Sequence, residues 1–142
     1  MNPSEIIPNL FIGNINDSLV FDGDVITVVH HNEKYTLAKN ATWLPVLEYH
    51  PSAVPGAIDE EYANRKNCDA VAEAIDTLLQ AGRKVLVHCL VGMERSPFAV
   101  AYFLQKKRGM GYNEAYDLII SKRPFVQRRA YRFYEAKDGI ME

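Results

Sequence analysis

Cysteine is scarce in this sequence, because only Cys68 and Cys89 occur among its 142 residues. Two cysteines are too few for a disulfide framework, so we expect a reducing, cytoplasmic setting. No apolar run approaches the roughly 20 residues that a membrane helix needs. The N-terminus has no basic segment followed by a long apolar one, so we expect no secretory leader and no membrane partner. The formal net charge of −2 provides no basic excess for a general nucleic-acid binder.

The chain also lacks an internal repeat, a low-complexity stretch and a Gly/Ser-rich linker. Its apolar residues, 48% of the total, suffice for one domain with a real core, which we expect to span residues 1–142. The main shift in composition falls at residues 48–62, "EYHPSAVPGAIDEEY". The two prolines, one glycine and four acidic residues of this stretch predict a long loop within the domain.

Strand-like and helix-like patterns alternate along the rest of the chain. Short apolar runs rich in β-branched residues predict strands at residues 9–13, 24–31, 41–48 and 84–89. Helical spacing of apolar residues predicts helices at residues 64–81, 96–109, 113–123 and 127–137, with Ser96 and Asn113 as caps of the second and third. The apolar run that ends at Cys89 is typical of a central strand. This alternation predicts an α/β domain with a central sheet flanked by helices.

The stretch "HCLVGMERS", residues 88–96, joins a predicted strand to a predicted helix. A strand that ends in a tight loop and opens a helix leaves backbone N–H groups pointing into the loop, and these form an anion site together with the helix dipole. That positive field favours the thiolate form of a cysteine at the first position, here Cys89. The planar guanidinium of Arg95 can bind two phosphate oxygens at once.

Three further residues of this stretch support the same interpretation. Gly92 lets the loop backbone close around an anion. Ser96 can donate a hydrogen bond to the Cys89 thiolate. His88 precedes the cysteine, where we expect it to brace the loop rather than to titrate during a reaction. An arginine at the far end of a cysteine turn has little purpose without an anion, so a purely structural turn is the weaker reading.

These residues resemble the H-C-x5-R-S/T signature of cysteine-dependent protein phosphatases. The sequence that follows, from "ERSPFAVAYFLQKKRG" through "NEAYDLIISKRP", resembles the dual-specificity branch of that family, and "IIPNLFIGN" resembles its opening strand. The clear resemblance covers residues 64–135 and is loose over residues 14–63. It implies a tyrosine-phosphatase-like fold, with a mixed or parallel sheet and a phosphate-binding loop between a central strand and a buried helix.

The resemblance also implies a metal-independent, cofactor-free phosphomonoester hydrolase that acts on phosphoproteins. The sequence does not determine the oligomeric state, for which we expect a monomer. Cys89 would attack phosphorus to form a phosphocysteine, which water then hydrolyses. A small domain suggests a shallow pocket, open to phosphotyrosine and also to phosphoserine or phosphothreonine. The equatorial oxygens would be held by the Arg95 guanidinium and by the backbone amides of Leu90, Val91, Gly92, Met93, Glu94 and Arg95.

The acid that protonates the leaving group has two candidates. Relatives carry it about thirty residues before the cysteine, which selects Asp59 here. Relatives also place it after a strand reading I/L-P-x-x-D, and "LPVLE" selects Glu48 instead. An insertion in the loop would reconcile the two patterns, and of the two residues we favour Asp59. Gln127 lies where relatives often carry a polar residue that positions the hydrolytic water, and a surface helix cap is its alternative role.

Glu94 departs from the family pattern, in which a small residue usually precedes the arginine. A carboxylate aimed at the phosphate would oppose binding, so we expect its side chain to face outward and to pair with a basic or N–H group. The loop also lacks lysine, which argues against inositol phospholipids and more weakly against RNA 5′-triphosphate. A phosphate-binding module without useful catalysis and a phosphatase acting on such a non-protein substrate remain the alternatives.

Overall fold

The structure, a computed structural model, describes residues 2–30, 41–49, 61–131 and 133–134. These form eight strands and four helices in the following order. The elements are β1 (Ser4–Ile7), β2 (Leu10–Gly13), α1 (Ile15–Val20), β3 (Asp24–Thr27), β4 (Thr42–Trp43), β5 (Leu47–Tyr49), β6 (Glu61–Asn64), α2 (Arg65–Gln80), β7 (Val85–His88), α3 (Arg95–Arg108), α4 (Tyr112–Lys122) and β8 (Phe133–Tyr134).

A five-stranded mixed sheet forms the centre of the fold, with the strand order β1-β2-β7-β3-β4. β7 pairs in parallel with β2 on one side and with β3 on the other, and only β1 runs antiparallel to its neighbour. All four residues of β7 are buried, as a strand covered on both faces requires. The predicted α/β architecture and the central position of this strand are confirmed.

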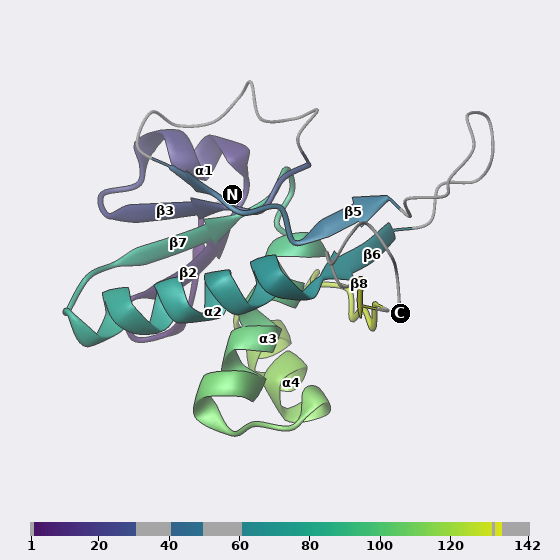
Figure 1. The fold of residues 1–142 in the computed structure, drawn as a ribbon. Coiled ribbons are helices and arrows are strands. Elements are labelled where there is room, and N and C mark those ends of the chain that lie inside the picture. The colour runs from purple at the N-terminus through teal and green to yellow at the C-terminus, as the bar shows by residue number, and fades with distance from the viewer. Residues whose placement is uncertain (1, 31–40, 50–60, 132, 135–142) are drawn as a thin grey trace.

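Helices cover both faces of this sheet (Figure 1). In that view α1 lies above the strands, while α2, α3 and α4 lie together below them. A smaller sheet, with the order β5-β6-β8, lies beyond the carboxyl ends of the parallel strands. In the part of the chain that the structure describes, no helix combines the length and the apolar character that crossing a membrane requires.

The two helices that precede and follow β7 form as their sequences predict. Asn64 caps α2 by accepting a hydrogen bond from the Asn67 N–H at 3.0 Å, and the apolar stripe of this helix faces the core. α3 is buried almost all round up to Leu104. It ends in a basic turn before Gly109, whose left-handed backbone (φ +68°) closes the helix.

Two sequence predictions fail where tertiary contacts redirect the chain. The strand expected at residues 41–48 is two strands, because the backbone leaves β4 before Pro45 and β5 pairs with β6 in the other sheet. The Pro45 carbonyl accepts from Asn67 Nδ2 at 2.8 Å instead of from a neighbouring strand. β3 is also shorter than predicted, since it ends at Thr27.

The predicted helix at residues 127–137 is wrong in its described part, because residues 127–131 are irregular and β8 follows. The predicted cap of α4 is wrong as well. Gly111 occupies the cap position, and its N–H donates to the side chain of Glu114 at 3.3 Å, so that Asn113 lies inside the helix. The hairpin of β1 and β2 and the short helix α1 lie N-terminal to the strands and helices that the sequence patterns predict most accurately.

Candidate active site

The loop between β7 and α3, residues 89–95, is hereafter the signature loop. Cys89 follows directly on the buried end of β7, and its side chain is only 3% exposed. Its sulfur lies 3.3 Å from Ser96 Oγ and accepts a hydrogen bond from the Gly92 N–H at 3.2 Å. A cavity of about 140 Å³ opens above it, lined by Cys89, Val91, Met93, Glu94 and Arg95. The cavity thus has room for a small anion beside Cys89.

Each backbone carbonyl from residue 89 to residue 93 accepts a hydrogen bond from a group outside the signature loop. The donors come from β7, α1, the end of α4 and the irregular segment after it. The five pairs, donor first, are His88 Nδ1 and Cys89 (3.1 Å), Ile15 N and Leu90 (3.1 Å), Arg123 Nη2 and Val91 (3.3 Å), Arg123 Nε and Gly92 (2.8 Å), and Gln127 N and Met93 (2.9 Å).

This arrangement fixes the direction of the loop amides. In a trans peptide the carbonyl and the following N–H point to opposite sides of the chain. Because the carbonyls of five consecutive residues are held outward, the N–H groups that follow them turn toward the inside of the loop. The Gly92 N–H shows this directly, since it donates to the Cys89 sulfur. The inner side of the loop therefore carries an array of donors suited to the oxygens of an anion.

Gly92 and Ser96 both contact the Cys89 sulfur. Gly92 has a left-handed backbone (φ +78°), and a Cβ there would lie 2.6 Å from Arg123 Nη2. The sequence predicts Ser96 as the cap of α3, but Ser96 does not occupy the cap position. The helix begins at Arg95, with Glu94 at the cap position but making no side-chain capping bond. The Ser96 side chain is instead fully buried against Cys89, the contact that the sequence also predicted.

His88 lies fully buried beneath the signature loop. Burial lowers the pKa of its imidazole, so the ring is neutral at neutral pH. A carbonyl can only accept, so the contact with the Cys89 carbonyl assigns the ring proton to Nδ1. This geometry suits the bracing role expected for His88. Within the described residues, no group of three or more His, Cys, Asp or Glu side chains is arranged to hold a metal ion.

The basic partner expected for Glu94 is present. Arg129 Nη2 donates to Glu94 Oε1 at 2.8 Å and also to Gln127 Oε1 at 2.9 Å. The side chains of this ion pair remain partly exposed, 43% for Arg129 and 37% for Glu94, so its own contribution to stability is small. Gln127 cannot cap a helix because none begins there. Its N–H donates to the Met93 carbonyl, and Arg129 joins its exposed side chain to Glu94, so Gln127 lies beside the signature loop.

The structure describes only one of the two candidate acids. Asp59 lies outside the described residues. Glu48 belongs to β5, where its backbone pairs with Tyr62 in β6. These two antiparallel strands flank residues 50–60 and lie beyond the carboxyl ends of the parallel strands, the side from which the signature loop also emerges (Figure 1). The backbone of Glu48 thus lies on the side of the sheet from which the signature loop emerges.

Arg123 is a functional candidate that the sequence predictions missed. It is fully buried, and it donates to two carbonyls of the signature loop. A signal for it was present in the sequence. Tyr116 and Ile119 point into the core, and Arg123 continues the same helical spacing as a charged residue in a core-facing position. A buried charge at such a position needs polar partners, which here are supplied by the loop.

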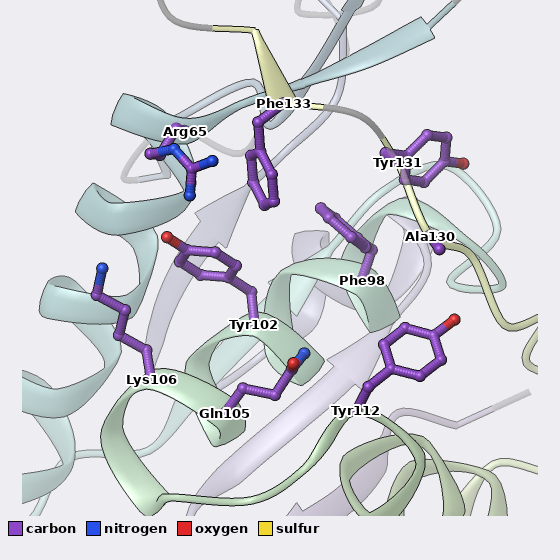
Figure 2. A pocket seen from close by; sticks show the side chains of 9 residues that line it. All are labelled: Arg65, Phe98, Tyr102, Gln105, Lys106, Tyr112, Ala130, Tyr131 and Phe133. Carbon is purple, nitrogen blue, oxygen red and sulfur yellow. The ribbon is translucent and has the colours of Figure 1, made fainter.

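A second and larger pocket, of about 460 Å³, shares no residue with the cavity above Cys89. Figure 2 shows its aromatic side chains gathered from α3, α4 and the end of the described chain, with Arg65 of α2 at one side. The Arg65 guanidinium lies 4.1 Å from the centre of the Phe133 ring. The lining of this larger pocket includes no cysteine, so the smaller cavity remains the candidate active site. The lining residues are Arg65, Phe98, Tyr102, Gln105, Lys106, Tyr112, Ala130, Tyr131 and Phe133.

Comparisons with known proteins agree with this geometry. The family described as "Dual specificity phosphatase, catalytic domain" matches residues 21–134. Dual specificity protein phosphatase 1B of Arabidopsis thaliana is 31% identical over 132 residues, covering 84% of this chain and 71% of the relative. MAP kinase phosphatase with leucine-rich repeats protein 3 of Dictyostelium discoideum is 30% identical over 142 residues, covering 88% of this chain but only 14% of that protein.

Among solved structures, the human tyrosine phosphatase-like serine/threonine/tyrosine-interacting protein superimposes with a TM-score of 0.70. The two sequences are 22% identical, and the superposition covers 91% of this chain and 89% of the other. At this level of identity the similarity establishes the fold alone.

Proposed function

The chain belongs to the dual-specificity phosphatase family and is a protein phosphatase, and from that premise we propose that Cys89 and Arg95 carry the reaction. The single observation that supports this most directly is the placement of the Cys89 sulfur. Cys89 lines the small cavity, and its sulfur lies within hydrogen-bond distance of the Gly92 N–H and of Ser96 Oγ. The substrate class is a phosphoprotein, with phosphotyrosine and phosphoserine or phosphothreonine as the groups removed.

The reaction proceeds in two steps. The Cys89 thiolate attacks phosphorus, and the ester oxygen leaves with a proton from the general acid, which gives a phosphocysteine. Arg95 and the inward N–H groups of the signature loop hold the equatorial oxygens while charge develops on them. Water then attacks phosphorus, the former acid accepts its proton, and Ser96 Oγ donates to the departing thiolate. A reducing, cytoplasmic compartment suits this chemistry because it keeps Cys89 reduced.

The reaction is expected to proceed without a metal ion. Purified protein should release phosphate from phosphotyrosine peptides and from a generic aryl phosphate at the same rate with and without EDTA, because the loop donors and Arg95 supply the positive charge. The measurement is phosphate release at saturating substrate, with phosphoserine peptides and a 5′-triphosphorylated RNA as parallel substrates. Tight phosphopeptide binding without turnover at any pH would refute the catalytic proposal and leave a binding module. Preferential hydrolysis of the RNA would refute the assignment of the substrate class.

We favour Asp59 as the general acid, and Asp59→Asn is expected to reduce kcat on phosphopeptides by roughly 10²- to 10⁴-fold, the usual contribution of such an acid. The loss should be much smaller on an aryl phosphate with an acidic leaving group, which needs no proton to depart. The alkaline limb of the pH profile should disappear in the same variant. Glu48→Gln is the matched comparison, and the assignment moves to Glu48 if that variant alone shows this pattern.

Glu94 and Arg129 fit a substrate of modest charge. Their ion pair beside the cavity cancels much of the field that either side chain would exert on an incoming anion. The side of the cavity that Glu94 lines thus adds little net positive charge beyond what Arg95 and the loop amides supply. A single phosphate ester on a protein is better matched to this site than a densely charged headgroup.

A further inference from the structure

Arg123, just after the end of α4, donates hydrogen bonds to two backbone carbonyls of the signature loop. It is 0% exposed, and its guanidinium makes hydrogen bonds in two directions. Toward the loop, Nε donates to the Gly92 carbonyl at 2.8 Å and Nη2 to the Val91 carbonyl at 3.3 Å. Away from the loop, Nη1 donates to the N-terminal part of the chain, at Asn2 O (3.4 Å), at Ser4 Oγ (3.0 Å) in β1 and at Ile12 O (3.4 Å) in β2.

The two loop contacts determine two peptide planes. The Val91 carbonyl shares a plane with the Gly92 N–H, and the Gly92 carbonyl shares one with the Met93 N–H. By holding both carbonyls outward, Arg123 turns these two N–H groups inward. One of them already donates to the Cys89 sulfur at 3.2 Å. The other, the Met93 N–H, belongs to a residue that lines the cavity beside Cys89.

The positive charge of Arg123 lies against the same part of the signature loop. Burial lowers the pKa of its guanidinium, while electrostatic interactions with Asp17 and Cys89 oppose that change, so the side chain remains a cation at neutral pH. The Phe125 ring packs on the guanidinium at 4.6 Å, and Gly92 leaves no room for a Cβ between the arginine and the loop. A fixed cation therefore lies directly behind the backbone that receives the anion.

On the basis of the function proposed above, we propose that Arg123 is a positioning residue for phosphoryl transfer. It acts through the loop, by aiming the Gly92 and Met93 amides at the sulfur and the phosphoryl oxygens, and it does not touch the substrate. A planar fork suits this task because a lysine at the same position provides a single ammonium, which cannot hold both carbonyls and the N-terminal strands together.

The test compares Arg123→Lys and Arg123→Met with the parent protein. We expect kcat on an aryl phosphate to fall about 10- to 100-fold in both, since misdirected amide donors stabilise the transition state less well. The affinity for inorganic tungstate, measured by calorimetric titration well below the unfolding temperature, should fall by about tenfold. If Arg123→Met does not fold, Arg123→Lys, which keeps a donor and a charge, provides the same two measurements.

Two controls separate this role from a structural one. Ile75→Ala, in the core on α2, lowers stability without touching the loop, so at a matched loss of thermal stability it should leave tungstate affinity unchanged. Ser4→Ala removes an acceptor only on the far side of Arg123 and should also leave that affinity unchanged. Folded Arg123 variants that keep parental tungstate affinity and kcat would overturn the proposal. If the parent protein itself neither binds tungstate nor releases phosphate, the proposed function fails instead.

Discussion

Replacing Cys89 with serine is expected to reduce phosphate release by about 10⁴-fold or more, the loss that follows removal of a covalent nucleophile. A serine hydroxyl is not ionised in this setting, so it cannot attack phosphorus as the thiolate does. The loop amides and Arg95 are untouched by the substitution, so the variant should still bind tungstate. Steady-state release from an aryl phosphate and calorimetric titration measure the two effects on one protein sample.

Cys68 provides the matched control for this experiment. It is equally buried, on the inner face of α2, and burial together with the nearby Asp69 raises the pKa of its thiol to about 12. Cys68→Ala should therefore leave kcat per folded molecule unchanged, and only Cys89 should be alkylated by iodoacetate at neutral pH. Equal turnover by the parent protein and Cys89→Ser would eliminate the phosphocysteine route.

Exchanging Arg95 for lysine is expected to lower kcat/KM by about 10³-fold, although the charge is kept. The guanidinium can bind two equatorial oxygens through two parallel N–H groups, whereas an ammonium presents one point charge. The loss should appear in kcat as well as in KM, because these oxygens gain charge in the transition state. Both parameters are obtained from initial rates over a range of phosphopeptide concentrations.

Arg108, at the opposite end of the same helix, supplies the comparison. Its side chain is exposed, and its guanidinium lies over the Phe103 ring at 5.6 Å, far along α3 from the signature loop. Arg108→Lys should keep both kinetic parameters near those of the parent protein. A similar loss in the two variants would indicate a general effect of the substitution on α3 and would remove Arg95 from the proposed mechanism.

The part of the site that the sequence predicts is the part built from neighbouring residues. A buried strand, a loop with a left-handed glycine and an apolar helix are each determined by local pattern. The contact between Cys89 and Ser96 follows from the single turn that separates them. This explains why the β7–loop–α3 unit was predicted well, while its surroundings were not.

The segment after α4 shows why local pattern was insufficient elsewhere. The sequence of residues 127–131 favours a helix, but their backbone groups make hydrogen bonds with other partners. The Gln127 N–H donates to the Met93 carbonyl, and the Arg129 carbonyl accepts from the Tyr112 and Tyr116 hydroxyls at 3.0 and 3.4 Å. Tertiary hydrogen bonds thus replace those of a helix, a choice that intrinsic propensity does not encode.

The outward carbonyls of the signature loop have a further consequence, for folding. Their donors include Ile15, Arg123 and Gln127, which lie tens of residues away on either side of the loop. Closing such long segments costs chain entropy before the contacts form, so we expect the loop to adopt this geometry only when the regions that carry these donors are assembled around it. An unfolded chain with the same signature lacks this site. We therefore expect oxyanion binding and folding to be thermodynamically linked, so that a bound oxyanion stabilises the entire fold.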